Sequence, residues 1–325
     1  MPMKKQHIWE ARLVRVLSRL PISLVLLFAR VLAAMFNWLP LSWAKPRRII
    51  VVNRLLTEPE SNWQEANDFA NKTFRETAIT IAGYSHIWLK PVDETLAHVS
   101  KIHGLEAWRQ SIAAGKPRLY LSLHQSSWEV PVLIVGREDP GTVVMYQPGR
   151  PSALEELVKD GREASGCELV PTNGDGIKRT LAVLEQGGAF GILADHKPGG
   201  KTNPYVPFFG IDASVPAFIH KVIKRYQPDI FFVSAQRPSD FTFEVFIERA
   251  TEVEQAGGEH ETLSAMMRGF ENIIRRNPTQ YQWSYKRFSG GPSGSWRWYK
   301  DANQLLEKVR GGAKAADVFK RHTDD

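Results

Sequence analysis

Residues 118–130 read RLYLSLHQSSWEV, a strand-like run followed by a polar turn. The apolar run leads to His124, and the next carboxylate, Glu129, follows five positions later. On an unbroken α-helix, two residues at this spacing point about 140° apart. If the strand ends at His124 and a helix begins near Ser126 or Ser127, Glu129 lies in the first helical turn and reaches back to the imidazole. The stretch therefore predicts a strand, a turn and a helix start that together hold a histidine–carboxylate pair.

Short apolar runs of the same kind recur along the chain and alternate with helical patterns. The strand-like runs after 118–124 are GTVVMYQP (141–148), CELVPT (167–172) and FGILAD (190–195). Strands that alternate with helices at this spacing predict an α/β fold with a mainly parallel central sheet flanked by helices. We expect helices over residues 60–115 and 260–278, and an antiparallel pair of edge strands over 229–238 and 241–250.

Polar side chains stand at or near the ends of three predicted strands, namely His124, Tyr146 and Asp195. In open α/β sheets, ligands bind outside the carboxyl ends of the strands, so these residues predict one shared pocket. A carboxylate on one imidazole nitrogen raises the basicity of the other, which suits deprotonation of a substrate hydroxyl. The alternative is a strand-end histidine that bonds the backbone, with Glu129 as a helix N-terminal charge.

The bulk composition limits the class of protein. The chain has 325 residues, 43% of them hydrophobic, with a formal net charge of +7. This balance is typical of a folded domain with anionic partners, such as an anionic membrane surface. The lone cysteine, Cys167, excludes an internal disulfide framework and a cysteine-cluster metal site.

Residues 20–43, LPISLVLLFARVLAAMFNWLPLSW, carry Arg30 as their only charge. A stretch of roughly 20 apolar residues is long enough to cross a bilayer, and it predicts an N-terminal hydrophobic membrane-anchor helix. Basic residues on both sides suit a helix that lies in the interface at least as well as one that spans; they are Lys4, Lys5, Arg12, Arg15, Arg19, Lys45, Arg47 and Arg48. The alternative is a buried hairpin of the core.

Other motifs do not support a different chemistry. HKPGGKT (196–202) lacks the first glycine of a phosphate-binding loop, and GDGIKR (174–179) has Arg179 in place of the third glycine of a dinucleotide fingerprint. No histidine pair at i and i+4 supports a metal hydrolase, and we expect no metal and no cofactor. The positive charge would permit a non-catalytic protein that binds anionic membranes or nucleic acid, but no nucleic-acid signature is present.

Four ordered motifs resemble the lipid A biosynthesis (late) acyltransferases of the wider glycerolipid acyltransferase superfamily. HQSSWE (124–129) resembles the H-x4-(D/E) block of that family, and Arg162 stands in VKDGREAS as its arginine does. LADHKPGGKTNPYVPFFG (193–210) resembles its Asp-Gln block and V-P-F-F-G signature, and NPTQYQWSYKRF (277–288) resembles its P-x-Q-Y-x-W ending. The resemblance covers about residues 20–290.

The resemblance implies transfer of a fatty acyl group from an acyl carrier protein thioester to a hydroxyl of a lipid A precursor, on the cytoplasmic face of the inner membrane. His124 would be the general base, oriented by Glu129. The resemblance carries over Arg162 and Asp195 as further active-site residues. We expect the substrate-binding set to comprise Arg162, Asp195, His196, Tyr146 and Arg287. Another glycolipid or phospholipid acceptor is the runner-up.

The chain departs from the family pattern in two places. It has Ser126-Ser127 where the family often has Gly-Asn, and His196 where the family has Gln. Neither change removes His124 or Glu129. The expected organisation is an anchor over residues 1–44, an acyltransferase domain over 45–290 and a charged C-terminal tail over 291–325.

Overall fold

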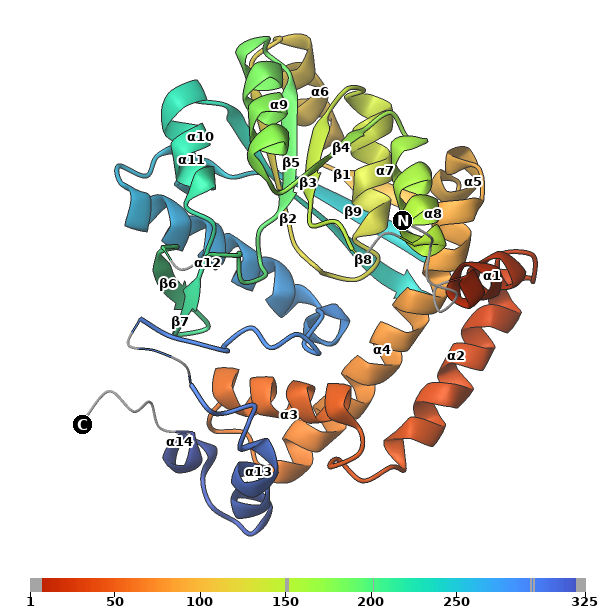
Figure 1. The fold of residues 1–325 in the computed structure, drawn as a ribbon, viewed down its shortest axis with the longest axis vertical. Coiled ribbons are helices and arrows are strands. Elements are labelled where there is room, and N and C mark those ends of the chain that lie inside the picture. Colours follow the sequence, from red (N-terminus) through yellow and green to blue (C-terminus); the bar gives the residue numbers. More distant parts are fainter. Residues whose placement is uncertain (1–7, 150–151, 201, 293, 295, 320–325) are drawn as a thin grey trace.

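A seven-stranded sheet forms the centre of the computed structural model, which describes residues 8–149, 152–200, 202–292, 294 and 296–319 (Figure 1). Its strand order is β1-β9-β8-β2-β5-β3-β4. Every neighbouring pair is parallel except β8 and β9. The strands are β1 (Val99–His103), β2 (Arg118–Ser122), β3 (Val143–Tyr146), β4 (Glu168–Pro171), β5 (Ala189–Leu193), β8 (Asp229–Ser239) and β9 (Thr242–Arg249). The prediction of a mainly parallel α/β sheet is confirmed.

Strand β1 is absent from the sequence prediction, because it lies inside residues 60–115, which were expected to be helical. A long helix, α4 (Trp63–Leu89), fills most of that stretch and begins with a capping box between Asn62 and Glu65. Only five residues form β1, too few for a clear alternation of apolar and polar positions. Because β1 pairs with β9, and β8 lies between β9 and β2, the predicted edge pair lies inside the sheet. Its antiparallel pairing is confirmed.

Helices cover both faces of the sheet, and the alternation of strand side chains separates two cores. Leu119 and Leu121 of β2 point to one core, whereas Tyr120 points to the other. The first core includes side chains of α3 (Lys45–Thr57), α9 (Gly174–Glu185), α10 (Phe218–Tyr226) and α12 (Glu259–Arg276). The second includes side chains of α4, α5 (Val92–Leu96), α6 (Leu105–Ala113) and α7 (Glu129–Glu138).

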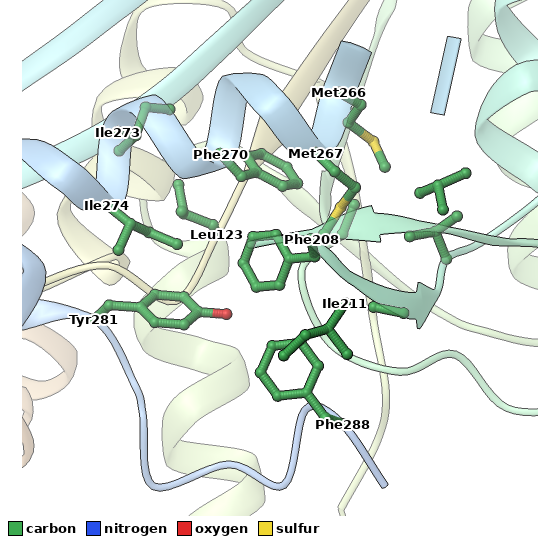
Figure 2. Close-up of a cluster of buried hydrophobic side chains, with 14 of the residues drawn as sticks. Leu123, Phe208, Ile211, Met266, Met267, Phe270, Ile273, Ile274, Tyr281 and Phe288 are labelled. Carbon is green, nitrogen blue, oxygen red and sulfur yellow. The ribbon is translucent and has the colours of Figure 1, made fainter. Parts of the chain in front are cut away.

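The first core contains Val206 and Phe208 of the V-P-F-F-G block. Strands β6 (Tyr205–Phe208) and β7 (Ile211–Ser214) form a small antiparallel hairpin, and the block lies in β6 and in the turn that follows it. Figure 2 shows Phe208 among side chains of α12, with Tyr281 and Phe288 on its other side. Phe208 is fully buried, and its ring centroid lies 6.5 Å from that of Tyr281. This packing places the segment after α12 beneath the sheet edge where β2 and β5 end.

The apolar segment over residues 20–43 forms one helix, and a separate helix precedes it. Helices α1 (Ile8–Leu17) and α2 (Ile22–Asn37) meet at Pro21, and α2 runs beside α4 (Figure 1). Among the described helices, none has both the length and the apolar character needed to cross a bilayer. Lys4 and Lys5 of the predicted basic flank lie outside the described residues.

Four further α-helices complete the described part of the chain. Helix α8 (Ala153–Glu163) follows β3, and α11 (Thr251–Glu254) follows β9. The charged C-terminal segment forms α13 (Ala302–Arg310) and α14 (Ala315–Val318), which pack against α3. Trp298 and Leu306 of this segment are buried in the first core. The Tyr299 hydroxyl also lies 2.5 Å from Asn53 Oδ1 in α3, so the segment is joined to the domain by polar and apolar contacts.

Candidate active site

The loop between β2 and α7 is held by the segment that follows α12. Ser126 has a φ of 53°, a left-handed conformation that glycine adopts more readily. Its backbone N–H donates to Gln280 O at 2.7 Å, and Gln125 forms an isolated antiparallel bridge with Tyr281. Glycine at this position would take the same left-handed conformation without the penalty of a Cβ. The loop thereby presents His124 at the carboxyl edge of the sheet.

Asp195 is the carboxylate that bonds His124. The imidazole Nδ1 lies 2.9 Å from Asp195 Oδ1, and the His124 backbone N–H donates to Oδ2 at 3.1 Å. The Tyr281 hydroxyl donates to the same Oδ2 at 2.9 Å. Strands β2 and β5 are parallel neighbours, so the residues that follow them meet at one edge. His124 and Asp195 therefore lie side by side at this edge, although Asp195 does not line the predicted shared pocket.

The charge of Asp195 fixes the tautomer of His124. Asp195 is fully buried, and burial alone would raise the pKa of its carboxyl group. The neighbouring His124 and His196 and the hydrogen bonds from His124 outweigh burial and hold this pKa well below its usual range. An ionised carboxylate only accepts hydrogen bonds, so the proton of a neutral His124 ring lies on Nδ1. Nε2 is then left as the basic nitrogen.

Glu129 does not form the predicted hydrogen bond to the imidazole. Its carboxylate accepts two bonds from Arg162, at 2.8 Å from Nε and 2.6 Å from Nη2. Glu129 is fully buried at the start of α7, and Arg162 stands in the last turn of α8. Burial alone would lower the pKa of Arg162, but the charge of Glu129 raises it. The Arg162 side chain is only 12% exposed, so its guanidinium requires a counter-charge, and this requirement explains why Glu129 faces α8.

A pocket of about 630 Å³ opens in front of His124. Tyr146, Arg162 and His196 also line it, whereas Asp195 lies behind His124. Its other lining residues are Trp128, Val132, Val144, Met145, Gln147, Thr172, Ile177, Ile192, Leu193, Lys197, Pro198, Gly199, Asn203, Pro216, Phe218 and Tyr285. The pocket thus combines an apolar wall with a polar end, as binding sites commonly do.

His196 lies between two rings. Its imidazole stacks on His124 and on Tyr285 with centroid distances of 3.7 Å in each case. Burial lowers the pKa of His196 to about 4, although Asp195 opposes this shift. The ring is therefore neutral at pH 7, and it acts as a flat wall that fixes the plane of the His124 ring.

His124, Asp195 and His196 bring potential metal-ligand atoms within 4.8 Å of one another. The two imidazole planes are inclined by only 3°, so their in-plane lone pairs run side by side instead of converging on one ion. The Asp195 oxygens already accept three hydrogen bonds. This arrangement fits a hydrogen-bonded histidine–carboxylate pair better than a metal centre.

Arg287 lies behind the site and does not line the pocket. Its side chain is buried, donates from Nη2 to Ser214 O at 2.9 Å and stacks over Phe208. Burial lowers its pKa, an effect that the nearby Tyr281 and Asp195 oppose. The structure therefore separates Arg287 from the predicted substrate-binding set.

Sequence reasoning did not single out Tyr281 and Tyr285. Both stand in the NPTQYQWSYKRF segment, more than eighty positions after Asp195, and no local spacing connects them to His124. The signal that could have found them is the aromatic density of this segment, since buried tyrosine hydroxyls need polar partners.

Comparisons with known proteins identify the family of the chain. The family model of bacterial lipid A biosynthesis acyltransferases matches residues 7–289. The chain is 22% identical over 244 residues to the lipid A biosynthesis palmitoleoyltransferase of Escherichia coli (strain K12), covering 74% of this chain and 78% of the relative. The same identity and coverage relate it to the lipid A biosynthesis acyltransferase of Shigella flexneri. The chain therefore belongs to the bacterial lipid A biosynthesis acyltransferase family and is an O-acyltransferase.

Proposed function

We propose that the protein transfers a fatty acyl chain from an acyl carrier protein thioester to a hydroxyl of a lipid A precursor, with His124 as the general base. The observation that carries this proposal is the His124–Asp195 hydrogen bond of 2.9 Å at the wall of the 630 Å³ pocket. It leaves a basic Nε2 for the acceptor hydroxyl. Asp195, rather than Glu129, orients the imidazole.

The reaction needs one proton to move twice. His124 Nε2 takes the proton of the acceptor hydroxyl while the oxygen attacks the thioester carbonyl carbon. The tetrahedral intermediate collapses, the carbon–sulfur bond breaks, and the imidazolium returns the proton to the leaving thiolate. The ionised Asp195 stabilises the imidazolium between these steps. General base catalysis of this kind contributes roughly 10²–10⁴-fold to the rate.

Glu129 has a positioning role in this proposal. Its two hydrogen bonds fix Arg162 over the Trp128 ring, where the guanidinium carbon lies 5.0 Å from the ring centroid. Trp128 in turn meets the His124 ring edge-on at 5.1 Å. The carboxylate of the H-x4-E block thus acts on the pocket through Arg162 and Trp128. Because Glu129 already balances the Arg162 charge, Lys197 is the pocket residue that supplies positive charge for a phosphorylated acceptor.

The first two helices supply a membrane-binding surface in this proposal. They and the adjoining loop expose a set of large apolar side chains: Trp9, Leu13, Val16, Leu20, Leu24, Leu27, Phe28, Val31, Leu32, Met35, Phe36, Trp38 and Trp43. Trp38 is 91% exposed and Trp43 79%, as expected of aromatic residues that insert at the headgroup level. Arg12, Arg15 and Arg19 add attraction to an anionic leaflet. These features support binding to an anionic membrane surface, and the location on the cytoplasmic face of the inner membrane is part of the proposal that rests on the family.

The net charge of +7 suits both proposed substrates, because acyl carrier proteins and phosphorylated lipids are anionic. A basic surface attracts such partners at long range and raises their association rate.

The test is an acyl-transfer assay with the purified full chain, a panel of acyl carrier protein thioesters, and either a lipid A precursor or a lysophospholipid as acceptor. We expect transfer to the lipid A precursor and a loss of roughly 10²–10⁴-fold in His124→Ala. Binding to anionic vesicles is measured on the same two proteins and should be equal. Transfer only to the lysophospholipid would show that the acceptor is a phospholipid and not a lipid A precursor. Full activity in His124→Ala would overturn the proposed base.

A further inference from the structure

A narrow apolar cavity of about 20 Å³ continues the main pocket between α7 and the sheet. The two share Val132, Val144, Ile192 and Leu193. The remaining lining of the cavity is Tyr120, Ser122, Pro131, Val135, Gly191 and Val233. The Ser122 hydroxyl donates to Val233 O at 2.8 Å, so it has a hydrogen-bond partner within the protein. The lining of the extension is thus apolar, and its volume suits only the end of an alkyl chain.

Gly191 is a glycine in the middle of a central strand, where it contributes no side chain to the core. Strand register places it opposite Tyr120 of β2 and Val144 of β3. A Cβ at this position would lie 3.4 Å from Val144 Cγ2 and 3.9 Å from Tyr120 Cβ, both ordinary contacts. Neither its backbone conformation nor close packing therefore requires glycine here. A glycine inside a strand often marks a place where a ligand approaches the backbone closely.

The far end of the cavity is closed by a fixed side chain. The Tyr120 hydroxyl donates to Asp139 Oδ2 at 2.6 Å and accepts from Trp108 Nε1 at 2.8 Å. Arg118 holds the same carboxylate with bonds of 2.8 and 3.0 Å. All four side chains are buried, so the floor of the cavity is anchored by a satisfied polar network.

We propose that the transferred acyl chain lies along this passage, with its methyl end against Gly191, and that Gly191 and Val144 set the longest chain accepted. This inference rests on the proposed function, because it deepens the donor site of the same reaction. Gly191 precedes Asp195 by four positions, which corresponds to a depth of about 13 Å along an extended strand. The added volume of a side chain at Gly191 would shorten the passage, and loss of volume at Val144 would lengthen it.

The first experiment measures transfer rates for octanoyl, decanoyl, dodecanoyl, tetradecanoyl and hexadecanoyl thioesters of acyl carrier protein. Gly191→Ala and Gly191→Val should move the preferred chain stepwise to shorter lengths. For each protein we compare the transfer rate of the longest accepted chain with that of the shortest. This ratio of rates should fall about 10-fold or more in Gly191→Val. Val144→Ala should move the preference the opposite way, a result that a folding defect does not produce.

Ile177→Ala is the matched control. Ile177 also lines the main pocket, but it belongs to the core on the opposite face of the sheet from Gly191. Its variant should keep the wild-type order of chain lengths. Chain-length ratios that stay within about twofold of wild type in all three Gly191 and Val144 variants would overturn the inference.

The second experiment does not depend on turnover. The same acyl series, as pantetheine thioesters, is added to His124→Ala with and without Gly191→Val, and thermal stabilisation is recorded for each chain length. If the chain length that gives the largest thermal stabilisation becomes shorter with Gly191→Val, the result supports the proposed passage even when no acceptor is acylated. Equal stabilisation profiles of the two proteins contradict it. Failure of transfer in the wild type, by contrast, counts against the proposed function.

Discussion

Asp195 and Glu129 are two fully buried carboxylates beside the same histidine segment, yet they have different partners. Asp195 follows β5 and accepts from the His124 ring, whereas Glu129 begins α7 and accepts two bonds from Arg162. Sequence spacing favours Glu129, because it is five positions away, and strand adjacency favours Asp195, which is 71 positions away. The difference teaches that sheet topology, rather than local spacing, chooses the partner of a strand-end histidine.

The largest expected effect comes from Asp195→Asn. The change keeps the volume but removes the charge that fixes the Nδ1 proton, so transfer should fall roughly 10³–10⁴-fold. Acyl-transfer kinetics at equal folded concentration measure it, with circular dichroism as the control for folding. A loss below about tenfold would show that Asp195 does not act through His124.

Glu129→Gln should act first on stability. It leaves the largely enclosed Arg162 guanidinium without a counter-charge, which costs about 3 kcal/mol in the free energy of unfolding. Denaturant melts measure this loss. The double variant Glu129→Gln with Arg162→Met is the matched control and should recover part of it, since neither buried charge remains. Transfer by Glu129→Gln should fall as far as in Arg162→Gln. An unchanged melt in Glu129→Gln would contradict a structural ion pair.

The lowered pKa of His196 predicts that the protein loses stability as the pH falls. Its pKa is lowered from 6.5 in the unfolded chain to about 4 in the fold. As the pH falls through this window, the unfolded chain binds a proton that the folded ring does not, and stability is lost. His196→Gln, which places the family's usual residue there, should lose less stability between about pH 6.5 and 4. Melting temperatures recorded across that range test the point, and parallel curves for the two proteins would refute it.

The smallest expected effect is that of Ser126→Gly. Glycine relieves the left-handed strain at φ 53° but makes the unfolded chain more flexible, for a net gain of about 0.5 kcal/mol. Ser127→Gly is the matched control: it is also buried but does not have a positive φ, so it should destabilise. Denaturant melts of both variants measure the difference. A larger loss at Ser126 than at Ser127 would contradict the strain argument.

The sheet could be predicted from sequence because its strands are apolar runs between clear turn signals. The five-residue β1 could not, since helix-forming sequence surrounds it and its pairing with β9 is non-local. Spacing and motif order located His124, Glu129, Arg162, Asp195 and His196, and Tyr146 was found as a strand end. Their pairing depended on which strands are neighbours. Tyr281 and Tyr285 escaped prediction because tertiary packing alone brings their segment to the site.

The most direct test of the central claim is the ¹⁵N chemical shifts of the His124 ring, measured at a pH where the ring is neutral and assigned by difference from His124→Ala. The structure predicts a proton on Nδ1 in the wild type and in Glu129→Gln, and loss of that preference in Asp195→Asn. A proton on Nε2 in the wild type, or a tautomer that changes with Glu129 and not with Asp195, would contradict the account.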